Sequence, residues 1–189
     1  EEIITDPEIK IVVEVMGGIE PARTFILEAL NKGKNVVTAN KDLLAIHGDE
    51  LLGTCKACSK DLFFEASVGG GIPIISSLKQ GLVANNIRQV LGIVNGTTNY
   101  ILTKMSKENV DFQTALREAQ ELGYAEADPS SDVEGLDAAR KIAILASIAF
   151  HTRVKLQDVY TEGITRIKPE DINYARELGY VIKLLGLAN

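Results

Sequence analysis

The architecture follows from a short β-branched run near the start of the chain, Ile9-Lys-Ile-Val-Val-Glu-Val-Met16. Such a run predicts a strand, and the pair Gly17-Gly18 closes it. Pro21 fits the first turn of a helix, which we expect to extend to Leu30. A second strand is predicted over Asn35-Val-Val-Thr-Ala39, because its middle is again β-branched.

The next predicted element is a helix from Leu43 to about Ser59, preceded by a loop at Asn40-Lys41-Asp42. Strand, helix, strand and helix with short connections imply parallel strands joined by right-handed crossovers. A complete Rossmann domain would carry Gly-x-Gly-x-x-Gly after its first strand and an acidic residue at the end of its second. The chain has neither feature. We therefore interpret residues 1–62 as the second half of a Rossmann-like nucleotide-binding domain.

Residues 63–189 are predicted to form a second domain of mixed helices and strands. We expect helices at 74–79, 97–105, 111–122, 137–150 and 170–185, and strands at 87–94 and 159–165. The predicted fold class is therefore α/β, with a partial Rossmann-like parallel sheet followed by an α+β domain.

Composition and charge narrow the possible partners. The net charge is −6 and there is no dense Lys/Arg run, which argues against nucleic acid and anionic membranes. No apolar stretch reaches transmembrane length and the acidic start does not resemble a signal peptide, so we expect a cytoplasmic protein. Cys55 and Cys58 lie in a predicted helix and lack the further ligand pair of a zinc site. We interpret them as packing thiols in a reducing compartment.

The densest group of ionisable residues lies between Leu122 and Lys141. It contains Glu126, Asp128, Asp132, Glu134, Asp137, Arg140 and Lys141. Asp137 and Lys141 are four residues apart and share one face of a helix, and the apolar run that follows to Phe150 indicates that this helix is buried. Carboxylates and an ammonium at the mouth of a buried helix indicate a site that binds a charged small molecule and moves a proton. The alternative is the ordinary ion pair of a surface helix.

Five blocks of the chain, taken together, resemble homoserine dehydrogenase. They are Val15-Met16-Gly17-Gly18, Asn35-Val-Val-Thr-Ala-Asn-Lys41, Phe64-Glu-Ala-Ser-Val-Gly-Gly-Gly-Ile-Pro73, Gly92-Ile-Val-Asn-Gly-Thr-Thr-Asn99, and Leu122 through Lys141. They follow the family's order and spacing and cover essentially the whole chain. The resemblance implies an enzyme that interconverts L-aspartate 4-semialdehyde and L-homoserine with NADP or NAD, in the biosynthesis of threonine, methionine and isoleucine.

The resemblance also implies roles for individual residues. Lys141 matches the general acid/base, Asp132 an acid that helps to position the substrate and this lysine, and Lys41 a catalytic lysine at the junction of cofactor and substrate. The implied substrate-binding residues are Glu126, Asp137 and Thr97, and the implied cofactor-binding residues are Lys41, Gly123 and Glu126. Carboxylates suit a substrate that carries an α-ammonium group, and an ammonium donor suits an alkoxide forming in the transition state.

A monovalent cation, usually sodium, is implied at the glycine-rich segment. In the family, main-chain carbonyls at the positions of Glu65, Val68, Gly70 and Ile72 bind it, and carbonyl oxygens suit a hard cation. The alternative is a plain tight turn. The resemblance further implies that residues 63–189 are the catalytic, substrate-binding and dimerisation domain of a homodimer.

Two other functions compete with this one. The glycine fingerprint is missing, as is a segment that follows in the family, so we expect a chain truncated at both ends. The first alternative is therefore that this truncated chain is a non-catalytic dimerisation module that cannot bind a dinucleotide. A phosphorylating semialdehyde dehydrogenase would instead need a cysteine nucleophile, and Cys55 and Cys58 lie far in sequence from the acidic residues.

Overall fold

The computed structural model describes residues 2–189, which divide into two compact units. The first unit comprises the chain up to Arg88 together with Ala143–Asp158, and the second comprises Gln89–Ile142 together with Val159–Asn189. Helix α8 (Leu136–Ala149) contributes to both. A small parallel sheet with helices, followed by mixed helices and strands, confirms the predicted α/β fold class.

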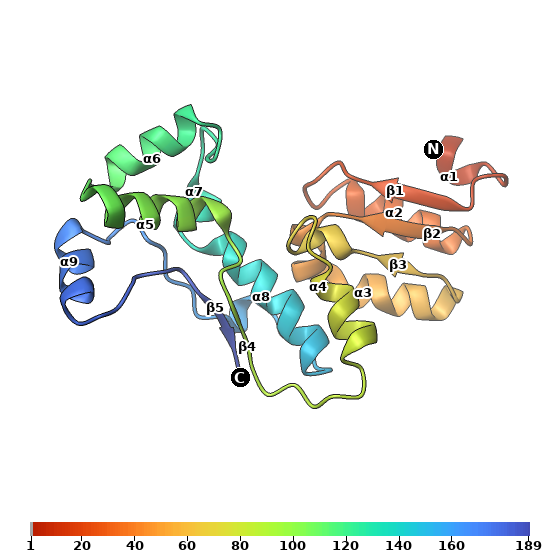
Figure 1. Ribbon diagram of the computed structural model, residues 1–189. Helices are drawn as coiled ribbons and strands as arrows, with labels where there is room; N and C mark the ends of the chain where they lie inside the picture. Colours follow the sequence, from red (N-terminus) through yellow and green to blue (C-terminus); the bar gives the residue numbers. More distant parts are fainter. Residues whose placement is uncertain (1) are drawn as a thin grey trace. The chain divides into compact units, whose positions relative to one another are not determined.

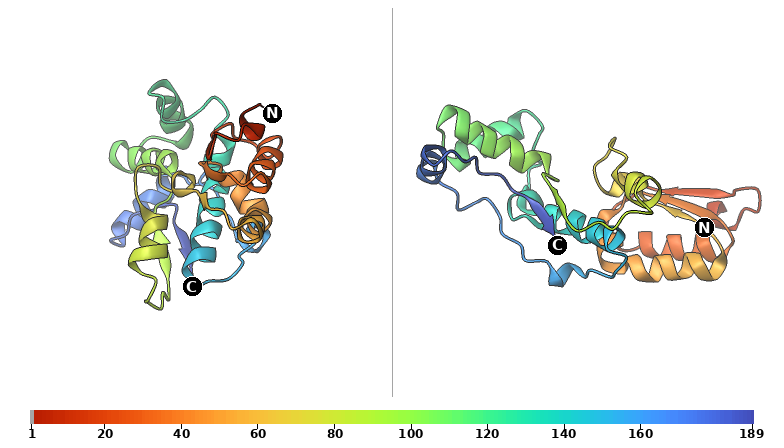
Figure 2. Two further views of the ribbon diagram at one scale, coloured as in Figure 1. Left: turned by 90° about the vertical axis from the view of Figure 1, so that its right-hand side faces the viewer. Right: turned by 60° about the horizontal axis from the view of Figure 1, so that its bottom comes forward.

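The sheet of the first unit has three parallel strands. In spatial order they are β1 (Ile11–Glu14), β2 (Asn35–Thr38) and β3 (Leu62–Phe63). Helices α2 (Ala22–Asn31) and α3 (Lys41–Cys58) connect the strands and lie side by side on one face of the sheet (Figures 1 and 2). The predicted parallel strand–helix–strand–helix pattern is confirmed.

Apolar burial holds the two connecting helices in place. Ile26 and Leu30 of α2, and Leu43 and Leu51 of α3, have at most 1% of their surface exposed. Burying one aliphatic side chain of this size contributes about 1.5–3 kcal/mol. The helix positions therefore follow from the apolar stripe that each helix carries.

The loop predicted at Asn40-Lys41-Asp42 is shorter in the structure: Asn40 lies outside the helix as expected, but helix α3 already begins at Lys41. The Asn40 side chain accepts a hydrogen bond from the Leu43 N–H at 3.1 Å and so caps the helix. Its amide nitrogen donates to the Gly18 carbonyl at 2.6 Å. Asn40 thereby ties the loop after β1 to the start of α3.

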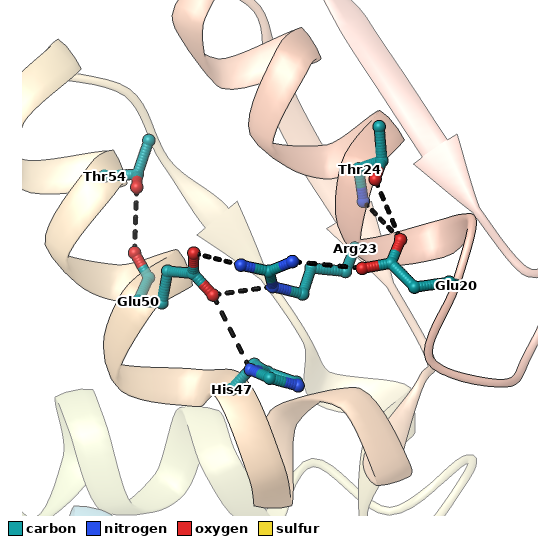
Figure 3. A network of polar contacts seen from close by, with 6 residues as sticks. All are labelled: Glu20, Arg23, Thr24, His47, Glu50 and Thr54. Carbon is teal, nitrogen blue, oxygen red and sulfur yellow. Dashed lines mark hydrogen bonds and ion pairs between the residues drawn. The ribbon is translucent and has the colours of Figure 1, made fainter.

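A surface group of charged residues joins α2 to α3 (Figure 3). Arg23 donates to both carboxylate oxygens of Glu50, at 2.7 and 2.5 Å, and to Glu20 at 3.0 Å. The hydrogen bonds from Arg23 lower the pKa of Glu50, and His47 Nδ1 lies 3.6 Å from the same carboxylate. The pair is bidentate but open to solvent, so it orients the helices more than it stabilises them.

The remaining elements of the first unit are short. They are α1 (Glu2–Thr5), the 3-10 turn η1 (Glu65–Ser67), α4 (Ile74–Ser76), the π-helical turn η2 (Ser77–Gly81) and the 3-10 turn η3 (Leu156–Asp158). The helix predicted at 74–79 thus consists of two successive helical turns. Across residues 2–189, no helix combines the length and the apolar character that a membrane crossing requires.

The second unit combines a two-stranded sheet with packed helices. Strand β4 (Val90–Gly92) pairs antiparallel with β5 (Gly186–Ala188). The helices are α5 (Gly96–Glu108), α6 (Phe112–Glu121), α7 (Ser130–Val133), α9 (Pro169–Glu177) and the first part of α8. Helix α5 packs against α6 and α9 (Figure 1), with Ile101, Leu102 and Met105 fully buried between them. The helices predicted at 97–105 and 111–122 are confirmed.

Two predictions for the last part of the chain are wrong. Residues 159–165 do not form a strand, because the Ile164 N–H donates to the Val133 carbonyl at 2.8 Å and the segment packs against α7. The helix predicted at 170–185 ends at Glu177, because Gly179 adopts a left-handed conformation (φ +80°).

The expected domain boundary after residue 62 stays a prediction. Leu62 and Phe63 belong to one strand, β3, and the two compact units separate after Arg88. The chain also returns to the first unit between Ala143 and Asp158, which no linear pattern in the sequence indicates.

Gly163 occupies a position where no side chain fits. A β-carbon there would lie 2.3 Å from the Val133 carbonyl oxygen and 2.7 Å from Glu134 Cα. Gly163→Ala is expected to lower the free energy of unfolding by about 1–3 kcal/mol, because the two backbone segments must move apart. Gly53→Ala in α3 is the control: no atom lies within 4 Å of its added β-carbon, and a gain of up to about 1 kcal/mol is expected. Urea denaturation measures both, and an unchanged midpoint for Gly163→Ala would contradict the close packing.

Candidate active site

Lys141, the predicted acid/base, lies in the first part of α8 and pairs with a buried carboxylate. Its Nζ is 2.7 Å from Asp137 Oδ2 and donates to the Val94 carbonyl at 2.9 Å. Asp137 is 5% exposed. An ion pair four residues apart is common on a surface helix, but here the carboxylate is buried and the lysine is half-buried, so an unpaired Asp137 charge would be costly. Two acceptors therefore hold the ammonium in one place.

An amide group links this pair to a second predicted carboxylate. Asn95 Nδ2 donates to Asp132 Oδ1 at 2.7 Å and to Asp137 Oδ2 at 2.8 Å. Asn95 precedes α5, Asp132 lies in α7 and Asp137 in α8. Residues Asn95, Asp132, Asp137 and Lys141 thus form one polar cluster, called here the lysine–carboxylate cluster. All four belong to the second unit.

One hydrogen bond places Thr97 beside the turn that contains Gly123 and leads to Glu126. The Thr97 hydroxyl donates to the Tyr124 carbonyl at 2.8 Å. This bond ties the first turn of α5 to the turn at Gly123 (φ +76°), and Glu126 follows with an exposed side chain. The ring of Tyr124 also contacts that of Tyr100, with centroids 4.9 Å apart. The predicted substrate residues Thr97 and Glu126 therefore flank one fixed turn.

Lys41 belongs to the first unit, at the carboxyl end of β2, where it begins α3. The loop after β1 is anchored at the same edge. Glu14 is buried there and accepts hydrogen bonds from the Thr38 hydroxyl and the Met16 N–H, both at 2.7 Å. The carboxyl edge of a parallel sheet is where α/β folds bind ligands, and Lys41 lies at that edge.

The four predicted cation ligands lie in one short loop of the first unit. Gly69 and Gly71 have positive φ, and the Ile72 N–H donates to the Gly69 carbonyl at 2.7 Å, closing a β-turn. The Ile72 carbonyl accepts from the Ile74 N–H at 2.8 Å. Within residues 2–189, no group of three or more His, Cys, Asp or Glu side chains is placed to hold a metal. Cation binding by the main-chain carbonyls of Glu65, Val68, Gly70 and Ile72 stays a prediction.

Asn95 is the site residue that its sequence context did not reveal. An Asn-Gly pair is typical of a turn, and here Asn95 caps helix α5. An asparagine directly before a helix is a recognisable capping signal. Nothing in the local sequence indicates its contacts with carboxylates that are 37 and 42 residues away.

A cavity of about 480 Å³ in the first unit contains none of the predicted site residues. It is lined by parts of α3, the last turns of α8 and the η3 region, with Leu44, Leu52, Ile144 and Leu156 among its apolar walls. The groups that can move a proton lie instead in the lysine–carboxylate cluster.

Two protein-family models match the chain. The model described as homoserine dehydrogenase matches residues 73–188, and the model described as homoserine dehydrogenase, NAD binding domain, matches residues 1–65. The homoserine dehydrogenase of Synechocystis sp. is 56% identical over 189 residues, which are 100% of this chain and 44% of that protein.

Solved structures give the same result. A homoserine dehydrogenase from Thiobacillus denitrificans has a TM-score of 0.97 and 52% identity, with 100% of this chain and 44% of the other covered. A hyperthermophilic archaeal homoserine dehydrogenase in complex with NADPH has a TM-score of 0.81 and 32% identity, with 95% and 52% covered.

The parallel strand–helix arrangement and the model matched by residues 1–65 place the chain in the class of Rossmann-type proteins. With the match over residues 73–188 and relatives above 50% identity, the chain belongs to the homoserine dehydrogenase family. It spans less than half the length of the curated relatives that it matches.

The Glu65 side chain holds the glycine-rich loop to α4, and this contact depends on pH. It accepts hydrogen bonds from the N–H groups of Ile75 and Ser76, both at 2.8 Å, and from the Ser76 hydroxyl. Desolvation raises the pKa of Glu65, but these hydrogen bonds outweigh it and lower the pKa below the ordinary 4.5. The stabilisation is therefore present above pH 4.5 and is lost as the pH falls through the lowered value.

Glu65→Gln is expected to flatten the loss of unfolding free energy between pH 7 and pH 3, because the variant has no carboxylate to protonate there. Urea denaturation across this pH range measures the slope. Glu28→Gln, an exposed carboxylate on α2, is the control and should keep the original slope. Equal slopes for Glu65→Gln and the unsubstituted protein would show that the contact does not contribute.

Proposed function

We propose that this chain is the catalytic region of an NAD(P)-dependent oxidoreductase. The enzyme interconverts L-aspartate 4-semialdehyde and L-homoserine, in the biosynthesis of threonine, methionine and isoleucine. The observation that carries the proposal is the Lys141 ammonium, held by Asp137 at 2.7 Å and by the Val94 carbonyl at 2.9 Å. Membership of the homoserine dehydrogenase family supports the same reaction.

Lys141 transfers the proton in this proposal. Its two acceptors use two of the three N–H donors of an ammonium, which leaves one donor for a substrate oxygen. In the direction of reduction, Lys141 donates a proton to the aldehyde oxygen as the carbonyl carbon receives a hydride. In the reverse direction, it takes the proton from the hydroxyl group. Asp132, joined to Asp137 through Asn95, keeps the acceptor of Lys141 in place.

Carboxylates recognise the amino-acid part of the substrate. Glu126 presents an exposed carboxylate beside the turn that Thr97 anchors, and it pairs with the α-ammonium group. Asp137 adds negative charge next to Lys141. A substrate with both an ammonium and an aldehyde oxygen matches a site that offers both a carboxylate and a proton donor.

The carboxyl edge of the sheet in the first unit fits a nicotinamide dinucleotide. At Gly17 and Gly18, φ is positive and no atom lies within 4 Å of an added β-carbon, so a ligand can approach the backbone closely. Val15 and Met16 are 73% and 58% exposed and offer apolar surface to a ring. Lys41 supplies a cation at the same edge for a phosphate or carboxylate. When bound, the nicotinamide supplies or accepts the hydride.

The cation site and the homodimer belong to the same proposal. Positive φ at Gly69 and Gly71 allows the backbone to turn alternate carbonyls inward, toward a monovalent cation. Dimerisation through residues 63–189 rests on the family resemblance.

In the complete protein, Lys141→Ala is expected to lower kcat for homoserine oxidation by about 10²–10⁴-fold, because the proton-transferring group is lost. The assay follows nicotinamide absorbance with L-homoserine and NAD or NADP. Lys107→Ala, at an exposed position of α5, is the matched control and should keep normal turnover. Near-normal turnover of Lys141→Ala would overturn its role. No turnover by the unsubstituted complete protein would favour the non-catalytic module.

Glu126→Gln is expected to raise KM for L-homoserine about tenfold with a smaller change in kcat, since a hydrogen bond to a charged group contributes about 1.5–3 kcal/mol. Steady-state kinetics with varied homoserine measures it. Glu121→Gln, exposed in α6, serves as the control. An unchanged KM for Glu126→Gln argues against ammonium recognition at this position.

A further inference from the structure

Asn95 makes contacts that its capping role does not need. Its Oδ1 accepts from the Thr98 N–H at 2.8 Å and from the Thr98 hydroxyl at 2.9 Å, which caps α5. Serine, aspartate and threonine also serve as helix caps. The Nδ2 group faces the other way and donates to Asp132 and Asp137. An amide alone offers an acceptor on one side and two N–H donors on the other.

The orientation of this amide is set by its surroundings. The Thr98 N–H can only donate, so Oδ1 must face it and Nδ2 must face the carboxylates. Asn95 is 5% exposed and Thr98 is fully buried. A flipped or missing amide would leave buried groups without a hydrogen-bond partner, which is unfavourable.

The amide also separates two like charges. Asp132 and Asp137 both accept from one nitrogen, at 2.7 and 2.8 Å, so their carboxylates approach closely and repel each other. The N–H donors between them offset that repulsion. Asp137 Oδ2 is held from two directions, by Asn95 at 2.8 Å and by Lys141 at 2.7 Å.

We infer that Asn95 is a positioning residue for proton transfer. Its amide fixes Asp137, and Asp137 in turn fixes the Lys141 ammonium against the Val94 carbonyl. The kinetic part of this inference rests on the proposed function, whereas the placement of Lys141 rests on geometry alone.

The test uses Asn95→Ser in the complete protein. Serine keeps an acceptor for the Thr98 N–H but is too short and has too few donors to bridge both carboxylates. We expect kcat for homoserine oxidation to fall about 10–100-fold with KM changed less than about threefold, because the ammonium loses its fixed position. Asp111→Ser, which changes the cap of α6 at the Thr114 N–H, is the matched control and should keep normal kinetics. Normal kcat for Asn95→Ser would overturn the inference.

A double variant separates positioning from a general structural effect. If Asn95 acts through Lys141, adding Asn95→Ser to Lys141→Ala should lower the residual rate by less than about twofold. The same factor in both backgrounds would mean that Asn95 supports the fold only, and the inference would fail.

A crystal structure of Asn95→Ser gives a readout that needs no turnover. We expect Lys141 Nζ to move away from Asp137 or from the Val94 carbonyl, and unchanged contacts at both would contradict the inference. Absence of homoserine oxidation by the unsubstituted protein would defeat the proposed function, yet the crystal structure would still show whether Asn95 positions Lys141.

If Asn95→Ser does not fold, Asn95→Asp replaces it. This variant has the same shape and capping oxygen and presents a third carboxylate where the amide donated.

Discussion

The buried carboxamide of Asn95 is the contact on which the candidate site depends. Its oxygen accepts a hydrogen bond from the first turn of α5. Its nitrogen donates to two carboxylates, one from α7 and one from α8. All four hydrogen-bonding positions of the amide are used, so the three helices meet in one arrangement. Because Asp137 pairs with Lys141, this arrangement also fixes the position of the Lys141 ammonium. In the proposed mechanism, the lysine that transfers the proton thus takes its position from a group that need not touch the substrate.

Close backbone packing supports the same corner of the second unit. Gly135 lies between α7 and α8 with φ +81°, and its added β-carbon would meet the Glu162 carbonyl oxygen at 2.9 Å. Gly163 approaches the Val133 carbonyl even more closely. Residues 159–165 therefore pack against the helices that carry Asp132 and Asp137. Because the backbone of this segment bonds to α7 instead of to another strand, the segment does not form a strand despite its β-branched residues.

The first unit uses the same device at the carboxyl edge of its sheet. Glu14 at the end of β1 accepts from Thr38 at the end of β2, and Asn40 donates to the Gly18 carbonyl. Buried polar groups, rather than the apolar side chains of the loop, thus join these neighbouring segments. This leaves Val15 and Met16 exposed and the glycine backbone open at the edge where such folds bind ligands.

Local patterns were enough for β1, β2, α2 and α6, because β-branched runs, glycine stops and apolar spacing act over a few residues. The Asp137–Lys141 pair was also predictable, since spacing on one helix decides it. The sequence by itself therefore determined the parallel α/β half, the helix that carries the lysine, and, through its motif blocks, the family. Tertiary structure alone decided that Asn95 meets Asp132 and Asp137, that residues 159–165 pack as a brace, and that 143–158 return to the first unit. These outcomes join segments many residues apart, and local propensity carries no information about which distant groups will satisfy a buried amide.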